Sequence, residues 1–253
     1  MRLTVVGCSG SYPGPDSPAS CYLVEAEHEE RTWRILLDLG NGALGALHRY
    51  ADPLAIDGVF LSHLHPDHCM DLCGYYVLRK YHPSGPRPTI PVWGPAGTAE
   101  RMARAYDLPP DLGMTEQFDF LSYAEPVELG PFRVEAVPVV HPVPAYALRV
   151  TADGHTLVYS GDTAPCAAFD EAATGADLLL AEASFRVGHD EPEGIHLNGR
   201  DVGLTATRAG VGRVVLTHVP PWHDPLRAID EARTAYDGPL DLAIAGATYL
   251  LEP

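Results

Sequence analysis

The chain has 253 residues, of which 46% are hydrophobic and 20% are charged, as expected of a globular protein with a substantial core. Its formal net charge is −17, and Lys80 is the only lysine. Long RNA or DNA is held mainly by Lys and Arg contacts to phosphates, so this charge argues against a long nucleic-acid partner. A small anionic substrate is compatible with it, because bound metal ions supply positive charge locally.

The sequence also argues against a membrane partner. Apolar runs are all too short for a membrane span, and residues 1–7 enter a strand pattern directly instead of resembling a signal peptide. The five cysteines are odd in number and lack the spacing of a zinc ribbon or finger. We therefore expect a cytoplasmic protein with free thiols. Without repeats or linkers, residues 1–253 are predicted to form a single domain.

Hydrophobic periodicity predicts strands that alternate with helices along the whole chain. Strands are expected at 2–7, 21–25, 33–39, 56–61, 90–93, 118–121, 132–140 and 240–245, with two strand-like runs between 142 and 161 and a further strand at 214–217. Helices are expected at 43–50, 69–82 with a break at Gly74, 96–106, 201–209 and 225–236. The alternation indicates a layered α/β domain.

Residues 62–68 contain the densest group of potential metal ligands in the chain. It places His63, His65, Asp67 and His68 directly after the buried strand at 56–61. Alternate residues at a strand end point the same way, so His63 and His65 can bind one metal, while Asp67 and His68 can face a second. Pro66 suits the first turn of a helix. Imidazole with carboxylate is a ligand set for zinc, and also for manganese or iron.

Four more candidate residues lie in the second half of the chain. His141 follows the strand at 132–140, Asp162 lies on a turn after a strand-like run, and His218 follows the strand at 214–217. His196 lies just ahead of a helical segment. A single histidine at a strand end is usually only a satisfied polar residue. The repetition at several strand ends favours a metal site.

These residues resemble the metallo-β-lactamase superfamily of metallo-hydrolases. The resemblance rests on the sequence HLHPDH at 63–68, the later strand-end histidine, the Gly-Asp-Thr turn at 161–163 and the Thr-His pair at 217–218, and it covers nearly the whole chain. It implies an αββα sandwich, in which two mixed β-sheets pack face to face with helices on both outer surfaces. It also implies two divalent metal ions, with Zn²⁺ expected first and Mn²⁺ or Fe²⁺ as alternatives. Carried over position by position, it gives one ion to His63, His65 and His141, the other to Asp67, His68 and His218, and a bridging role to Asp162.

Further segments are similar to the ribonuclease Z-like branch of that superfamily. The run at 181–184 resembles the branch's His-Glu-Ala-Thr segment, and His196 falls where the branch has a histidine before Ser-Thr, although Leu197 and Asn198 replace that pair. The long arm with which transfer-RNA processing enzymes grip their substrate is missing between His141 and Asp162. The runs GCSGS at 7–11, DSPAS at 16–20 and THVPPW at 217–222 resemble small actinobacterial proteins similar to cyclic-nucleotide phosphodiesterases.

The resemblance implies hydrolysis of a small phosphodiester, foremost a cyclic nucleotide of the 3′,5′-cyclic AMP type, by attack of a metal-bridging hydroxide. His196 is the candidate general acid. Asp67 is a second candidate catalytic residue, which orients His196 or the nucleophile in addition to binding metal. Glu182 is expected to support the ligands.

Three alternative functions compete with this prediction. They are a lactone or thioester hydrolase, ribonuclease Z-like RNA 3′ processing, which the missing arm and the acidity disfavour, and a metal-binding or sensing module without turnover. Seven intact ligand positions argue against the last. Trp222 either stacks on a purine or packs beneath a loop, and the sequence leaves both open, as it does the role of the loop at 7–20. It also leaves the oligomeric state open, with a homodimer as one option.

Overall fold

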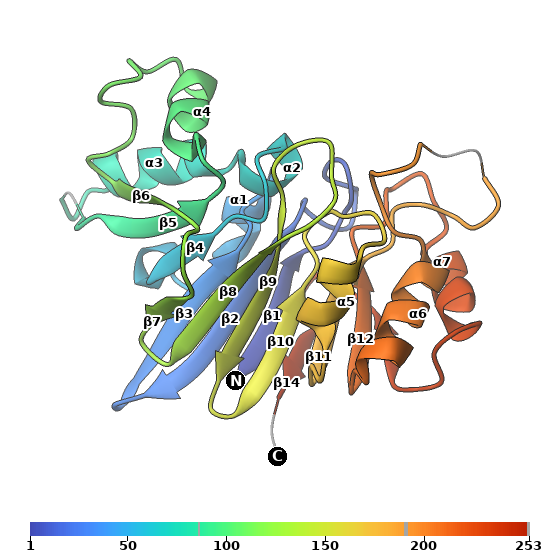
Figure 1. The fold of residues 1–253 in the computed structure, drawn as a ribbon. Coiled ribbons are helices and arrows are strands. Elements are labelled where there is room, and N and C mark those ends of the chain that lie inside the picture. The colour runs from blue at the N-terminus through green and yellow to red at the C-terminus, as the bar shows by residue number, and fades with distance from the viewer. Residues whose placement is uncertain (86, 190–191, 252–253) are drawn as a thin grey trace.

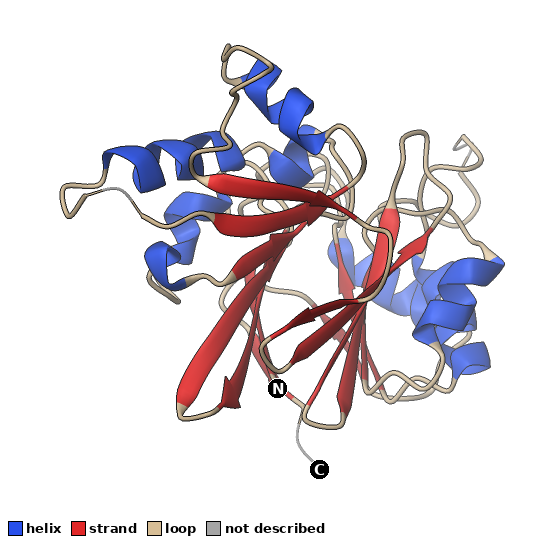
Figure 2. Cartoon of the chain, turned by 60° about the vertical axis from the view of Figure 1, so that its left-hand side comes forward, coloured by secondary structure: helices blue, strands red, loops and turns tan. Residues whose placement is uncertain are grey.

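Two seven-stranded β-sheets lie face to face, and helices cover the outer surface of each (Figures 1 and 2). The computed structural model describes residues 1–85, 87–189 and 192–251. Each sheet contains both parallel and antiparallel pairs, so the αββα sandwich with two mixed sheets expected from the sequence is confirmed. In the part of the chain that is described, the helices are too short or too polar to cross a membrane.

The first sheet is antiparallel on one side of β3 and parallel on the other. In spatial order its strands are β14 (Thr248–Leu250), β1 (Arg2–Gly7), β2 (Cys21–His28), β3 (Arg31–Leu37), β4 (Gly58–Phe60), β5 (Ile90–Gly94) and β6 (Phe118–Ser122). The helical elements along this half of the chain are α1 (Ala43–Leu47), the 3₁₀ helix η1 (Pro53–Ala55), α2 (Pro66–Cys69), α3 (Leu72–Tyr81) and α4 (Thr98–Ala105).

The second sheet repeats this division, with parallel pairs from β10 to β13 and antiparallel pairs from β7 to β10. In spatial order its strands are β13 (Leu240–Leu242), β12 (Arg213–Thr217), β11 (Leu178–Glu182), β10 (His155–Tyr159), β9 (Tyr146–Ala152), β8 (Phe132–Pro138) and β7 (Val127–Leu129). Three helices lie along its outer face in Figure 1: α5 (Ala167–Ala173), α6 (Gly199–Ala209) and α7 (Pro225–Arg233).

The alternation of side chains along each strand divides the interior into three apolar layers. Val5 of β1 packs in the layer between the sheets, whereas the next residue, Val6, packs under the helices of the first sheet. In β11, Leu180 belongs to the central layer and Leu179 to the layer under the helices of the second sheet. Since both faces of these strands are buried, they appear in the sequence as continuous apolar runs.

The helix expected at 69–82 is divided, but the prediction of a break at Gly74 is wrong. The break falls at Met70–Asp71, between α2 and α3. There the Asp71 carboxylate accepts a hydrogen bond from the Leu44 N–H at the start of α1, at 2.8 Å, while the Asp71 N–H donates to the Leu39 carbonyl. Gly74 lies inside α3, where a Cβ atom would come within 3.2 Å of Leu44 Cδ2. Its role is thus close packing of α3 against α1.

Other elements differ from the prediction mainly in length. Regular pairing of β8 ends at Pro138, before the expected residue 140, and β4 keeps only three of the six residues predicted at 56–61. The strands β7 and β14 were not predicted, because three residues are too few for a period to show. The helix α5 and the strand β11 were also missed; β11 is buried along its whole length, so its sequence does not alternate.

Candidate metal centre

The candidate residues are carried by segments that leave the strands of both sheets at a common edge. The stretch 62–68 follows β4, Asp162 follows β10, and His218 comes immediately after β12. His141 lies three residues beyond Pro138 at the end of β8, next to an isolated bridge between Val140 and Ala164. The face-to-face packing of the two sheets thus brings together side chains that are far apart in the sequence.

Local backbone geometry fixes two turns of the site, the one that carries Asp67 and His68 and the one that carries Asp162. Pro66 occupies the first turn of α2 as predicted, with His65 at the N-cap, so Asp67 and His68 are positioned by a helical turn. The turn before Asp162 needs glycine. Gly161 has a φ of +57°, and a Cβ atom there would lie 2.7 Å from the Cβ of Ser62. The turn after β10 can therefore approach the stretch after β4 closely.

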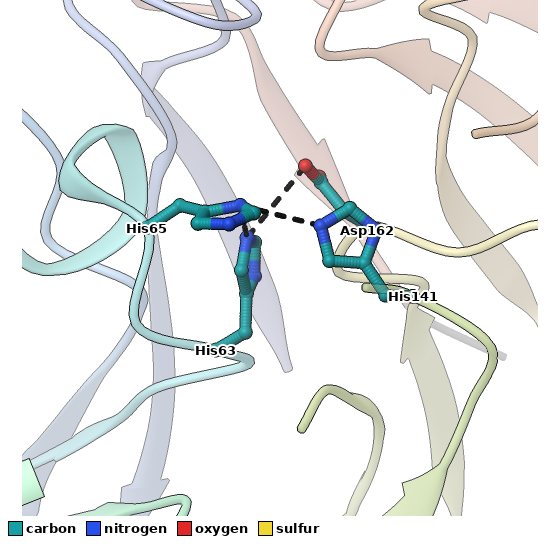
Figure 3. Close-up of side chains that lie close together, drawn as sticks. All are labelled: His63, His65, His141 and Asp162. Atoms are coloured by element: carbon teal, nitrogen blue, oxygen red, sulfur yellow. Dashed lines mark hydrogen bonds and ion pairs between the residues drawn. The ribbon is translucent and has the colours of Figure 1, made fainter. Parts of the chain in front are cut away.

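The first group of side chains contains three imidazoles and a carboxylate that point toward one another (Figure 3). His63 Nε2 lies 3.0 Å from His65 Nδ1, and His65 Nδ1 lies 3.2 Å from His141 Nε2. Asp162 Oδ2 lies 3.7 Å from His63 Nε2. The four ligand atoms thus lie within 4.8 Å of one another, close enough to bind one metal ion.

A second group adjoins the first and shares its carboxylate. His68 Nε2 lies 3.0 Å from His218 Nε2, and Asp67 Oδ2 lies 3.1 Å from His218 Nε2. The other oxygen of Asp162, Oδ1, is 3.3 Å from His68 Nε2 and 3.5 Å from His218 Nε2. The two oxygens of Asp162 therefore face different groups. The structure brings all seven residues predicted as ligands together in the division expected from the sequence.

Hydrogen bonds on the outer side fix the tautomers of four histidines. His141 Nδ1 faces the Ile195 carbonyl at 2.9 Å, and His68 Nδ1 faces the Asp38 carboxylate at 2.7 Å. The Ser62 and Tyr159 hydroxyls, at 3.5 and 3.4 Å from His68 Nδ1, both donate to Asp38. His63 Nδ1 faces Ser62 Oγ, at 3.1 Å, and His218 Nδ1 faces Ser184 Oγ, at 2.8 Å. Each of these hydroxyls already donates elsewhere, to Asp38 and to the His218 carbonyl. All four Nδ1 atoms must therefore donate, which leaves the Nε2 lone pairs directed inward.

Asp38 is the main residue of the site that the sequence did not reveal. It is fully buried and accepts hydrogen bonds from the Ser62 N–H, the Ser62 hydroxyl and the Tyr159 hydroxyl, each at 2.7 Å, besides its contact with His68. Its signal is the position after β3, at the same edge as the other site residues, within the Leu-Asp-Leu-Gly run at 37–40. Because all its partners are distant in sequence, only the fold shows what it orients.

The electrostatics of the site favour bound cations. Burial lowers the pKa of His63 well below its ordinary value, so its ring is neutral. Burial opposes the charge of Asp162, but His218, His68 and His63 more than compensate and hold its pKa well below the usual range. Burial likewise opposes a charge on His68, yet Asp162 and Asp38 raise its pKa well above normal. The field that retains a proton at His68 would also stabilise a metal cation in its place.

The donor set fits divalent metal ions in composition as well as in position. Imidazole nitrogen and carboxylate oxygen are standard ligands of zinc, manganese and iron. Asp162 Oδ1 is buried and receives no hydrogen bond of suitable geometry from any residue that the structure describes. A buried carboxylate oxygen without a donor is costly, and a cation between the facing imidazoles would satisfy it.

His196 lies beside this cluster and is held by Glu182. Its Nδ1 lies 2.9 Å from Glu182 Oε1 and 3.8 Å from Asp162 Oδ2. Burial opposes the charged ring, but Glu182 and then Asp162 raise the pKa of His196 to about 9. The expectation that Asp67 orients His196 is not what the geometry shows, because Glu182 holds the ring and Asp67 contacts His218. Glu182 also accepts the Thr163 N–H at 2.8 Å, next to Asp162, in agreement with its predicted supporting role.

The sandwich of two β-sheets, with a cluster of histidines and aspartates at one edge, defines a metallo-β-lactamase-type domain. A family model described as a β-lactamase superfamily domain matches residues 33–219. The chain belongs to the β-lactamase superfamily.

Relatives along the whole length agree with this membership. An uncharacterized protein of Mycobacterium tuberculosis is 43% identical over 98% of this chain and 92% of its own length. The probable metallo-hydrolase YhfI of Bacillus subtilis is 31% identical over 97% of this chain and 98% of its own, and its crystal structure superposes with a TM-score of 0.87 over 98% of both chains. A ribonuclease Z of Mycobacterium bovis is 30% identical over 87% of this chain and 86% of its own.

Proposed function

We propose that the chain is a metal-dependent hydrolase that holds two divalent ions, foremost Zn²⁺. The first ion would be held by His63, His65 and His141, and the second by Asp67, His68 and His218. Asp162 would bind both. The division of its two carboxylate oxygens between the groups is the observation that carries this proposal.

The proposed reaction is hydrolysis of a small phosphodiester, foremost a cyclic nucleotide of the 3′,5′-cyclic AMP type. The seven residues would hold divalent ions, which would supply the Lewis acidity that hydrolysis of a phosphodiester needs. The relative named ribonuclease Z acts, by its name, on RNA, itself a phosphodiester polymer. The relative YhfI is named a probable metallo-hydrolase, which supports metal-dependent hydrolysis as the reaction class.

His196 is the proposed proton donor to the departing oxygen. Glu182 fixes its Nδ1 and stabilises the protonated ring, so a proton is held at the other nitrogen, beside the cluster. The side chain of His196 is 15% exposed, and two hollows of about 450 and 210 Å³ both have His196 in their walls. A substrate bound in either hollow would therefore contact His196. The larger of these hollows has a volume usual for a small-molecule site.

A substrate panel tests the reaction class. We expect the Zn²⁺-loaded protein to hydrolyse 3′,5′-cyclic AMP at a rate well above that on a lactone, a thioester or a precursor transfer RNA at physiological salt. The net charge of −17 and the short segment 142–161 between two site residues disfavour RNA. Faster turnover of the lactone or thioester would establish the carboxyl-ester alternative, and efficient cleavage at the precursor 3′ end would establish the RNA-processing one.

A further inference from the structure

Two large aromatic side chains are exposed next to each other at the rim of the site. Tyr12 comes from the loop after β1 and is 46% exposed, and Trp222 comes from the loop after β12 and is 59% exposed. Their ring centroids are 5.4 Å apart, at an interplanar angle of 32°. An exposed pair of aromatic rings in contact offers an apolar face on which a planar ligand can stack. The structure thereby shows that Trp222 does not pack beneath the loop.

The backbone holds this pair at a fixed place relative to the metal centre. The His218 N–H donates to the Cys8 carbonyl at 3.0 Å, and the Gly10 N–H donates to the Val219 carbonyl at 3.2 Å. A Cβ atom on Gly10 would lie 2.2 Å from the His218 carbonyl oxygen, so the loop that carries Tyr12 lies directly against the backbone of His218. The loop at 7–20, whose role the sequence left open, is thus part of the wall of the site.

A hollow of about 210 Å³ is lined by Trp222 of the aromatic pair and by His196 of the site. Its walls include Trp222 and Ser11 on the outer side and Ser184, Phe185 and His196 on the inner side. Ser184 is hydrogen-bonded to His218, and the ring centroid of His196 is 5.9 Å from that of His218. A molecule with its phosphate at the metal centre can therefore extend through this hollow to the ring of Trp222, which Tyr12 contacts.

We propose that Trp222 and Tyr12 form a platform on which the base of a nucleotide stacks while its phosphodiester lies at the metal centre. This assignment rests on the proposed function and adds to it the feature that selects nucleotides among phosphodiesters. Stacking suits an acidic protein, because it requires no basic side chain and uses the neutral face of the base. The two rings are binding residues, and the platform should act on substrate affinity more than on the chemical step.

The test compares two ligands that differ by the base. Binding of 5′-AMP and of ribose 5-phosphate to the Zn²⁺-loaded protein is measured by calorimetry. We expect 5′-AMP to bind more tightly by on the order of ten-fold or more, the usual effect of one stacked base. Trp222→Leu and Tyr12→Leu should each reduce this ratio, and Trp222→Phe, which keeps an aromatic face, should preserve most of it. Tyr81→Leu removes a comparably exposed aromatic ring from α3 and is the matched control.

The outcomes separate the platform from the proposed reaction. Equal affinities for the two ligands in the unaltered protein, or an unchanged ratio in both Trp222→Leu and Tyr12→Leu, would overturn the platform even if cyclic AMP is hydrolysed. A ratio that depends on Trp222, in a protein that does not hydrolyse cyclic AMP, would support the platform and refute the reaction. Where cyclic AMP is turned over, Trp222→Leu should raise KM with little change in kcat, whereas a general structural defect would lower kcat as well.

Discussion

Asp162→Ala is expected to reduce the metal content from two ions per chain to at most one and to abolish phosphodiester hydrolysis with it. Asp162 faces both groups of imidazoles, with Oδ2 toward His63 and Oδ1 toward His68 and His218. A carboxylate between two divalent cations offsets their mutual repulsion, so its removal leaves them destabilised. Metal analysis of the purified variant, together with its rate on 3′,5′-cyclic AMP, measures both effects.

Asp38→Asn is the matched comparison for that variant. It also removes a buried negative charge from the site, but Asp38 contacts the outer nitrogen of His68 and not its inward-facing one. We expect both ions to remain bindable, with affinity for at least one weakened by about 10–100-fold, as is usual when the partner of a metal-binding histidine is altered. Full occupancy of both sites in Asp162→Ala, under conditions where the unaltered protein is also full, would show that Asp162 does not bridge.

His196→Ala should lose on the order of 10²–10⁴-fold in rate on 3′,5′-cyclic AMP, the usual contribution of general acid catalysis. The departing ribose oxygen is strongly basic and needs a proton. A nitrophenolate is a weak base that leaves unaided, so the same variant should lose much less on bis-nitrophenyl phosphate. Rates on the two substrates, measured for one preparation of known metal content, give the comparison.

The two-substrate design protects this prediction against a trivial explanation. A folding defect or a loss of metal would lower both rates by the same factor, whereas a missing proton donor acts selectively. Glu182→Gln keeps the shape of the side chain next to His196 but removes the charge that holds the proton on the ring. Its rate on 3′,5′-cyclic AMP should fall by less than in His196→Ala, and again by more than its rate on bis-nitrophenyl phosphate. Equal losses on both substrates, with metal retained, would assign His196 a structural or binding role.

The features of the fold and site that depend on neighbouring residues in the sequence were predictable. The run at 63–68 combines a strand end with a helix start, and Pro66 indicated the start of α2. The alternation of strands and helices gave the layered class, and the resemblance supplied the pairing of the two sheets. His141, Asp162 and His218 stood out because each follows a strand, and strand ends of one sheet share an edge.

The remaining features depend on contacts that no local pattern encodes. Asp38 is thirty positions from His68 in sequence, so its hydrogen bonds to the site exist only in the folded chain. The same reason explains why Glu182, and not Asp67, holds His196. The break of the helix at Met70–Asp71 was missed because Asp71 is drawn to the backbone of α1, a tertiary contact that overrides helix propensity. Trp222 could be placed only once the partner ring of Tyr12 was known.

Titration of the metal-free protein with Zn²⁺, while the hydrolysis of 3′,5′-cyclic AMP is followed, tests the central claim most directly. Chelated protein should be inactive, and activity should rise to a plateau at two equivalents of metal per chain, the number that the two groups joined by Asp162 can hold. Mn²⁺ in a parallel titration shows whether the plateau depends on the identity of the metal. Turnover of the cyclic nucleotide without metal, or its absence after two equivalents have bound, would contradict the assignment of a dinuclear phosphodiesterase.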